Sequence, residues 1–215
     1  MLTFAEEILL LLLEDEQGKF LPVTRHALGH ALVGAVLMDL AFANRIDTDL
    51  ERLTVTDATP THNPMLDEVL ERIVSSRKAR SAVDWLKALS GEEAANIREQ
   101  ALASLVERGI VERRDTKVLG FFRSRRYPPV DGERMRSASL RISELLSSDQ
   151  IPDPRDVALV SLADACGVLR TAFEEAEIER NMPRLRQLGK MDLIGREMLG
   201  RISVWKHGLT GPDDD

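Results

Sequence analysis

The sequence contains very little cysteine and few aromatic residues. Among its 215 residues there is one cysteine, Cys166, and aromatic residues make up only 4%. A single cysteine excludes an intrachain disulfide and any metal site built from several thiolates, and it fits a reducing compartment such as the cytoplasm. Because strands favour aromatic and β-branched residues whereas Leu, Ala, Arg and Glu favour helices, the composition indicates a mainly α protein.

The sequence also lacks a hydrophobic run long enough to cross a bilayer. A membrane-spanning helix needs about 20 apolar residues. The most apolar stretch, residues 26–44, is interrupted by four polar residues: His26, His30, Asp39 and Asn44. The apolar run at residues 8–13 follows no basic segment and has acidic residues on both sides, unlike a signal peptide. We therefore expect neither a membrane span nor export.

Motifs for catalysis and for metal binding are missing as well. The sequence has no glycine-rich phosphate loop and no nucleophile elbow. His26 and His30 are one helical turn apart, but the pattern His-Glu-x-x-His and a third ligand are absent. Cys166 falls in an apolar helical stripe without a neighbouring nucleophile motif, so we interpret it as a core residue. The sequence thus predicts no enzyme, no metal site and no cofactor.

Residues 26–44 are apolar around nearly the whole circumference of a helix. Such a helix belongs inside a protein, surrounded by other elements. Gly29 and Gly34 each lower its helix propensity by about 1 kcal/mol, so we expect them to allow another backbone to approach closely. The predicted fold is a single globular helical domain built around this central helix and two short β-hairpins. It is expected to span residues 1–208, followed by an acidic flexible tail at 209–215.

Short motifs place the other elements. Thr3 with Glu6 forms a capping box that predicts a helix at the N-terminus, and Ser90 with Glu93 forms a second one. Gly109 is expected to end the helix that Ser90 begins. Further helices are predicted over residues 64–76, 132–147, 154–174 and, in one or two pieces, 176–206, with β-hairpins over 45–56 and 110–127.

The second hairpin carries positive charge in an acidic chain. The formal net charge is -7, and most carboxylates are expected on helix faces, one turn from Arg or Lys. Residues 112–126, however, contain six basic and two acidic residues. Two strands, 110–114 and 118–123, are predicted to flank the turn Asp115-Thr116-Lys117.

Apolar residues accompany these cations on the predicted protruding ribbon, a combination typical of an interfacial membrane anchor. The alternative is that the apolar residues pack on the core or on a second subunit while the arginines are solvated. The residues of this predicted contact surface are Val118, Leu119, Phe121, Phe122, Arg123, Arg125 and Arg126.

Five segments of the chain resemble the Golgi phosphoprotein 3 family. They are LTFAEEILLL (2–11), LMDLAFANRI (37–46), MLDEVL (65–70), LVERGIV (105–111) and VALVSLADACGVL (157–169). Their order and spacing run nearly end to end. The resemblance implies a non-enzymatic peripheral protein with a protruding hairpin for membrane contact and self-association. Eukaryotic members of this family bind phosphatidylinositol 4-phosphate at the Golgi and help retain glycosyltransferases, and the family also has bacterial members.

The resemblance also implies a lipid head-group site, which in the family is formed by a tryptophan and three arginines. Matching the segments places the tryptophan at Thr24 and the arginines at Val33, Ala95 and Arg98, so only Arg98 keeps the family residue. Arg25 lies next to the altered tryptophan position. We expect Arg25 and Arg98 to contact a head group without the family's specificity, since specific phosphate binding requires several charge-assisted donors.

We interpret the chain as a peripheral membrane or adaptor protein of the cytoplasm or of the inner face of a membrane. Its expected partners are an anionic membrane surface or a phosphoinositide, and a second copy of the chain through the hairpin 110–127. The alternative is a winged-helix nucleic-acid-binding protein, because residues 97–127 resemble a helix followed by a basic wing. Residues 92–108 carry four glutamates against two arginines, which repels phosphate. Nucleic-acid binding is therefore expected to be weak and non-specific.

Overall fold

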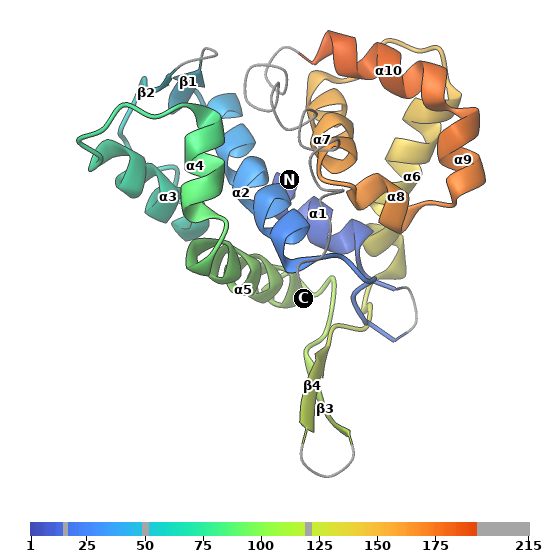
Figure 1. Ribbon diagram of the computed structural model, residues 1–215. Coiled ribbons are helices and arrows are strands. Elements are labelled where there is room, and N and C mark those ends of the chain that lie inside the picture. Colours follow the sequence, from blue (N-terminus) through green and yellow to red (C-terminus); the bar gives the residue numbers. More distant parts are fainter. Residues whose placement is uncertain (15–16, 49–51, 119–121, 193–215) are drawn as a thin grey trace, which may run out of the picture.

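Helices make up most of the molecule. The computed structural model describes residues 1–14, 17–48, 52–118 and 122–192, and within them the sheets are two antiparallel strand pairs (Figure 1). The predicted mainly α, single globular fold is confirmed. The helices are α1 (Phe4–Leu11), α2 (Arg25–Phe42), α3 (Pro64–Val74), α4 (Ala82–Leu89), α5 (Glu92–Glu107), α6 (Gly132–Ser147), α7 (Pro154–Ala165), α8 (Val168–Ala172), α9 (Glu175–Arg180) and α10 (Met182–Met191), and the strands are β1 (Ile46–Thr48), β2 (Leu53–Val55), β3 (Arg114–Val118) and β4 (Phe122–Arg126).

Helix α2 is the centre of the core, as predicted. All residues from Gly29 to Leu40 are buried, and α1, α3, α4, α5 and α7 pack around the helix. In Figure 1 it lies between α1 and α4. The first turn differs from the expectation, because Arg25 is exposed and Leu28 is only half-buried. This end of α2 opens onto the pocket described below.

The glycines of α2 allow close packing. A Cβ atom added to Gly29 would lie 2.5 Å from the carbonyl oxygen of Ser90, so the predicted approach of another backbone is confirmed there. At Gly34 the neighbour is instead the side chain of Leu162, at 2.8 Å. The expectation of a backbone contact at Gly34 is therefore wrong, although both positions are too tight for a side chain.

Helix termini follow the sequence signals in part. Thr3 and Glu6 form the predicted capping box at the start of α1. The second predicted box is wrong, because α5 has Gly91 as its N-cap with no side-chain cap. Ser90 is the C-cap of α4, and its hydroxyl donates to the carbonyl of Lys87 at 3.2 Å. Since α4 and α5 are separated by only two residues, Ser90 cannot serve both helices.

The helix predicted over residues 154–174 is broken in two. Helix α7 ends at Ala165 with Cys166 as its C-cap, and Gly167 has a φ of +75° before α8 begins. A residue in this left-handed region ends an α-helix, and glycine adopts it without steric cost. Cys166 is buried, which confirms its assignment to the core. The segment predicted over 176–206 forms α9 and α10 as far as Met191, and the predicted tail at 209–215 lies outside the described residues.

Buried carboxylates of α1 pair with arginines from distant parts of the chain. Glu6 is 2% exposed, and its Oε2 lies 3.0 Å from Nη1 of Arg108. Glu7 is 3% exposed and forms an ion pair with Arg141. The expectation of partners one helical turn away is wrong for these residues. Removing one partner of such a pair leaves a buried charge uncompensated, which costs several kcal/mol, on the order of 3–5.

A third buried carboxylate, Asp39, joins α2 to α1 and α7. Its Oδ2 accepts the N–H of Phe4 at 2.9 Å, and its Oδ1 accepts from Nη1 of Arg155 at 3.1 Å. The guanidinium of Arg155 also lies over the ring of Phe4, 3.8 Å from its centroid. Burial raises the pKa of Asp39 to about 6, against the opposing effect of Arg155.

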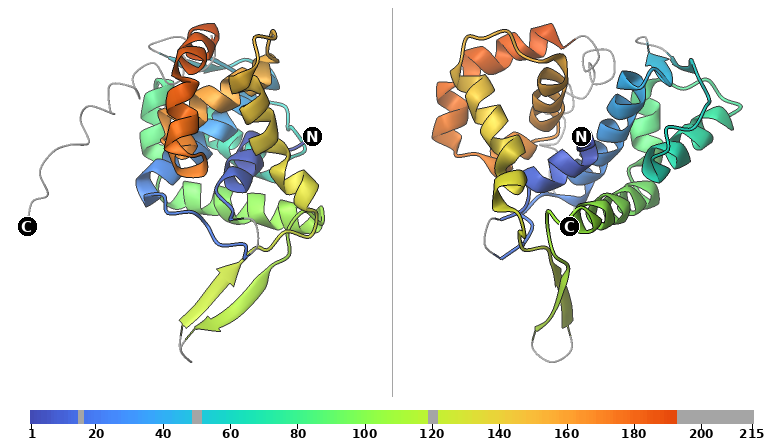
Figure 2. Two further views of the ribbon diagram at one scale, coloured as in Figure 1. Left: turned by 90° about the vertical axis from the view of Figure 1, so that its right-hand side faces the viewer. Right: turned by 180° about the vertical axis from the view of Figure 1, so that it is seen from behind.

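Both predicted hairpins are present, and the second projects from the helical body (Figure 1, Figure 2). Its predicted turn is wrong. Asp115, Thr116 and Lys117 lie within β3, opposite Arg125, Ser124 and Arg123 of β4. Asp115 and Arg125 are opposite charges, which is favourable across an antiparallel pair, whereas Lys117 faces the like charge of Arg123. The ladder continues to Val118 and Phe122, and residues 119–121 lie outside the described residues.

Candidate functional site

A pocket of about 710 Å³ opens at the start of α2. It is bounded by the segment 20–23 that leads into α2, by the first turns of α2, and by the start of α5. Arg25 and Arg98, the two residues predicted to contact a head group, both line it. They come from different helices and are 73 positions apart, so the fold is what brings them together. We refer to this cavity as the α2–α5 pocket.

Arg98 is held in this pocket by an aromatic ring. Its guanidinium carbon lies 4.5 Å from the centroid of Phe20, a cation–π geometry. Its Nε is buried and has no hydrogen-bond partner among the described residues. A buried, unsatisfied charged donor is costly. Arg98 as a whole is only partly buried and lines the α2–α5 pocket, so its guanidinium is held at the wall of this pocket.

Phe20 was not identified from the sequence. It is an isolated aromatic residue in a loop of a chain with few aromatics, followed closely by Pro22. The signal available in the sequence was the rarity of aromatic residues, because an aromatic ring in a loop of such a chain is expected to pack against a specific partner. No sequence pattern links Phe20 to Arg98, which is far along the chain.

The remaining lining of the pocket is largely apolar. Leu21, Val23, Leu28 and Leu32 contribute hydrophobic side chains. Glu92 also lines the pocket, and it is the one acidic residue among the lining residues that the structure describes. Two arginines against one glutamate leave a modest positive charge, placed next to apolar surface.

The base of the second hairpin is joined to this pocket through Phe20. The N–H of Tyr127 donates to the carbonyl of Gly18 at 2.8 Å, and the rings of Tyr127 and Phe20 lie edge to face with centroids 6.1 Å apart. Arg125 of β4 forms an ion pair with Glu99 of α5 at 2.8 Å. The hairpin and the pocket therefore share one side of the molecule.

The predicted contact residues are divided between the two ends of the hairpin, with Val118, Phe122 and Arg123 towards its outer end and Arg125 and Arg126 at its base. Val118 and Phe122 are opposite each other at the last described pair of the ladder, and Arg123 is opposite Lys117. Leu119 and Phe121 lie outside the described residues. Arg126 is opposite Arg114, and these like charges have separate partners, because Arg126 contacts Gln17 while Arg114 contacts Glu112.

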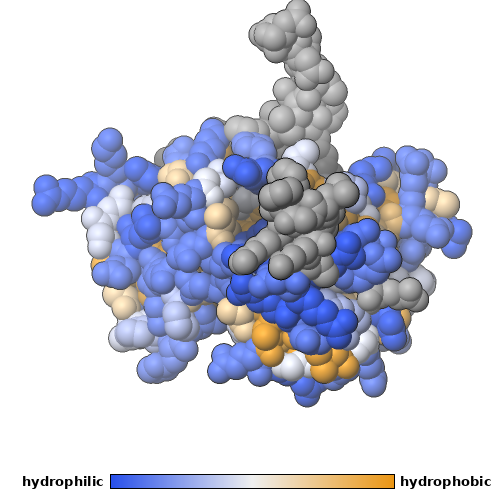
Figure 3. All heavy atoms as spheres, turned by 90° about the horizontal axis from the view of Figure 1, so that it is seen from below, coloured by the Kyte–Doolittle hydropathy of each residue, from blue (hydrophilic) through white to orange (hydrophobic). Residues whose placement is uncertain are grey.

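The face that carries the hairpin is mainly hydrophilic. Figure 3 views the molecule from this side and shows a hydrophobic patch of limited extent on an otherwise polar surface. Large exposed apolar patches are the usual mark of a hydrophobic interface.

The two histidines of the central helix interact with each other. The rings of His26 and His30 lie 4.1 Å apart, and Nδ1 of His30 is 2.9 Å from the carbonyl oxygen of His26. Burial lowers the pKa of His30. Within residues 1–14, 17–48, 52–118 and 122–192, no cluster of His, Cys, Asp or Glu could hold a metal ion, and no described helix is long and apolar enough to cross a membrane.

Comparison with known proteins identifies the family. The model of the Golgi phosphoprotein 3 (GPP34) family matches residues 4–200. The chain belongs to the Golgi phosphoprotein 3 family. It is also similar to the vacuolar protein sorting-associated protein 74 of Schizosaccharomyces pombe, with 28% identity over 242 aligned positions that cover 97% of this chain and 69% of the relative. The family resemblance expected from the five segments is therefore confirmed.

The four positions matched to the head-group site of the Golgi phosphoprotein 3 family lie in different surroundings. Of the positions matched to the family's head-group site, Ala95 and Arg98 line the α2–α5 pocket. Thr24 is the N-cap of α2, and its hydroxyl accepts the N–H of Ala27. Val33 is fully buried in the core. An arginine would not fit at the buried position of Val33. The cations among the described lining residues of the pocket are Arg25 and Arg98.

Proposed function

We propose that this member of the Golgi phosphoprotein 3 family is a non-enzymatic peripheral membrane protein that binds an anionic lipid head group in the α2–α5 pocket. The observation that carries the proposal is Arg98, whose guanidinium is fixed against Phe20 in the lining of the pocket and forms none of the ion pairs found in the described part of the chain. Such a guanidinium can donate charge-assisted hydrogen bonds to a lipid phosphate, and Arg25 adds a second charge to the same pocket.

The second hairpin lies on the same side of the molecule as the α2–α5 pocket, so both can face one membrane surface. An isolated two-stranded ribbon is marginally stable in water, and both of its edges have unpaired backbone groups. β3 and β4 form such a ribbon, projecting from the body next to the pocket. We propose that a membrane interface covers its outer half, and that self-association through residues 110–127 is a second use of the same surface.

Two features favour lipid over nucleic acid as the anionic partner. Helix α5, which precedes the ribbon, exposes Glu92 and Glu107 and would repel a phosphate backbone. The pocket itself has an apolar lining beside its arginines. A lipid head group with its attached glycerol matches that combination, whereas a duplex backbone does not enter a concave pocket.

Vesicle co-sedimentation tests the pocket. Wild-type protein is expected to bind vesicles rich in phosphatidylglycerol or phosphatidylserine, with little preference for phosphatidylinositol 4-phosphate, since two arginines cannot form the full phosphate cradle. Arg98→Ala should weaken binding roughly tenfold, equivalent to about 1.4 kcal/mol. Arg98→Lys should also weaken it, because an ammonium group lacks the planar stacking on Phe20.

A matched control separates the pocket from general charge loss. Arg186→Ala removes an exposed arginine of α10, far from the α2–α5 pocket, and should leave vesicle binding unchanged. The proposal is wrong if Arg98→Ala binds like wild type, or if Arg186→Ala reduces binding as strongly as Arg98→Ala does.

A further inference from the structure

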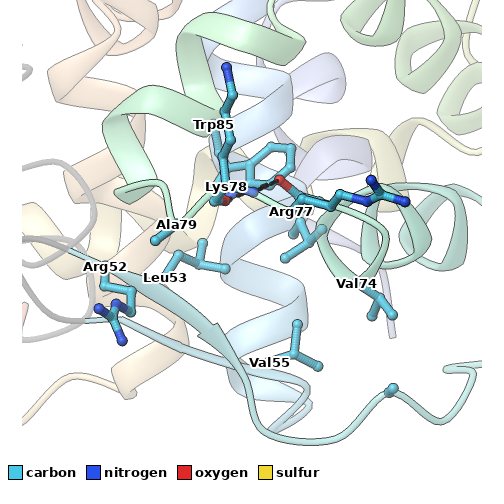
Figure 4. Close-up of a pocket in the computed structure, with 11 residues that line it drawn as sticks. Arg52, Leu53, Val55, Val74, Arg77, Lys78, Ala79 and Trp85 are labelled. Atoms are coloured by element: carbon cyan, nitrogen blue, oxygen red, sulfur yellow. Dashed lines mark hydrogen bonds between the residues drawn. The ribbon is translucent and has the colours of Figure 1, made fainter.

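A second pocket lies at the end of the molecule away from the second hairpin. Its volume is about 420 Å³, and it is formed by β2, the end of α3 and the connection from α3 to α4. Figure 4 shows Leu53, Val55, Val74 and Trp85 around its interior. Val74 is 48% exposed, whereas Trp85 is 4% exposed. The pocket therefore offers an apolar interior that is open to solvent on one side.

Cations surround this apolar interior. Arg52, Arg77 and Lys78 line the pocket, and no acidic residue is found among its described lining residues. In Figure 4, Arg52 and Arg77 lie on opposite sides of it. The guanidinium of Arg80 lies 4.8 Å from the centroid of the Trp85 ring. We call the group formed by Arg52, Arg77, Lys78 and Trp85 the basic pocket.

Two cations of the basic pocket, Arg77 and Lys78, are without an ion-pair partner among the described residues. Both side chains are exposed. The whole chain has a formal net charge of -7. The adjacent unpaired cations Arg77 and Lys78 are therefore a local exception, and they attract an anionic partner.

The backbone of the basic pocket argues against a small phosphate ligand. Phosphate sites use several free backbone N–H groups as well as side chains. Here the N–H of Leu53 already donates to the carbonyl of Arg80 at 2.8 Å, and that of Lys78 donates to the hydroxyl of Ser76 at 3.3 Å. A ligand that relies on long side chains for charge and on Trp85 for apolar contact fits better.

We propose that the basic pocket binds a short acidic peptide segment of a partner protein. An apolar side chain of that segment packs against Leu53, Val55 and Trp85, and its flanking carboxylates pair with Arg52, Arg77 and Lys78. Clusters of arginine are a common means of recognising acidic motifs. Because the basic pocket and the second hairpin lie at opposite ends of the molecule (Figure 1), the partner and a surface touched by the hairpin can be bound at the same time.

The test uses a labelled synthetic peptide in which a central leucine is flanked on each side by two aspartates. Binding is measured by fluorescence anisotropy with the full-length chain. The chain contains two tryptophans, so Trp205→Phe leaves Trp85 as the sole intrinsic reporter of the basic pocket. We expect saturable binding, a change in Trp85 emission, and affinity that falls with added salt.

Variants locate the site. Arg77→Ala with Lys78→Ala should weaken peptide binding at least about tenfold, equivalent to about 1.4 kcal/mol. The matched control Arg186→Ala with Lys190→Ala removes the same two charge types from α10 and should have no effect. A peptide in which serine replaces the leucine should bind several-fold more weakly, since the apolar contact is lost. Equal binding by both double variants would overturn the proposal.

Two further results would assign the basic pocket to another partner. If Arg77→Ala with Lys78→Ala abolishes binding to anionic vesicles and leaves peptide binding intact, the surface contacts membrane and the peptide proposal is wrong. The chain's own residues Asp213, Asp214 and Asp215 are also acidic. If the peptide binds only after these three are changed to serine, the occupant is this tail rather than a partner protein.

Discussion

The titration of Asp39 links pH to stability. Its pKa is raised to about 6, chiefly by burial, above the value of about 3.9 in an unfolded chain. The folded state therefore binds more protons than the unfolded state between these two values. The resulting stabilisation is fully present below about pH 4 and is lost as the pH rises through about 6.

We expect Asp39→Asn to remove this pH dependence. From about pH 4 to about pH 7, the free energy of unfolding of wild type should fall relative to that of the variant, by on the order of 3 kcal/mol. Urea denaturation across this pH range measures the difference. The control is Asp149→Asn, an exposed aspartate. Parallel pH profiles for wild type and Asp39→Asn would show that Asp39 does not titrate differently in the folded state.

At the residue scale, the sequence predicts properties that depend on a residue's own pattern. The burial of Cys166 and the tight contact at Gly29 follow from helical periodicity and from glycine's small size. The partners of Asp39 could not be predicted in this way, because Arg155 lies 116 positions away. The same holds for Arg98 and Phe20. Their contact depends on how α5 packs beside the loop before α2, which no local signal encodes.

At the scale of elements, the outer half of the second hairpin is the part with the clearest expected role. Phe121 and Phe122 belong to the predicted contact surface, and fully burying one phenylalanine contributes about 1.5–3 kcal/mol. Changing both to serine should weaken binding to anionic vesicles at least about tenfold and should not lower the melting temperature of the protein. Vesicle co-sedimentation and thermal unfolding measure these two effects.

The control for this variant changes the ribbon without removing apolar groups or cations. Thr116 and Ser124 are opposite each other in the ladder, and Thr116→Ala with Ser124→Ala should bind like wild type. Loss of folding in the phenylalanine variant would place these residues in the core. A change from dimer to monomer with unaltered vesicle binding would instead assign the hairpin to self-association alone.

Elements were predicted best where one signal decided their limits. Thr3 with Glu6 at the start of α1 is such a case. Where two signals competed, the prediction was wrong. Ser90 was available as a cap for α5 but is used by α4, and the turn-forming residues Asp115–Lys117 are instead paired with Arg123–Arg125 in the ladder of β3 and β4. Which element uses such a residue depends on the neighbouring helix or strand, and the local sequence around the residue carries no information about that neighbour.

At the scale of the whole molecule, an acidic protein is proposed to bind an acidic surface through local cations. Each arginine or lysine near an anionic membrane contributes about 1 kcal/mol, within a screening distance of about 8 Å at physiological salt. The chain's net charge of -7 opposes this attraction. Because salt screens the attraction between the local cations and the membrane, binding should be more sensitive to salt than the insertion of apolar groups alone would be.

We expect vesicle binding to weaken several-fold when the salt concentration is raised from about 0.05 M to about 0.5 M. Co-sedimentation with vesicles rich in phosphatidylglycerol measures the effect. Vesicles of phosphatidylcholine provide the control, and their weak binding should not change with salt. Binding to phosphatidylglycerol that is constant over this range would mean that the arginines of the pocket and the ribbon do not contribute.

The connection between ribbon and body also has a mechanical consequence. Tyr127, at the end of β4, is tied to Gly18 by a hydrogen bond and to Phe20 by ring contact, and Phe20 supports Arg98. The base of the ribbon and the guanidinium in the α2–α5 pocket are thus connected through one aromatic pair, Tyr127 and Phe20. If force on the ribbon displaces Arg98 through this pair, reciprocity requires that a ligand bound to Arg98 restrains the ribbon in turn.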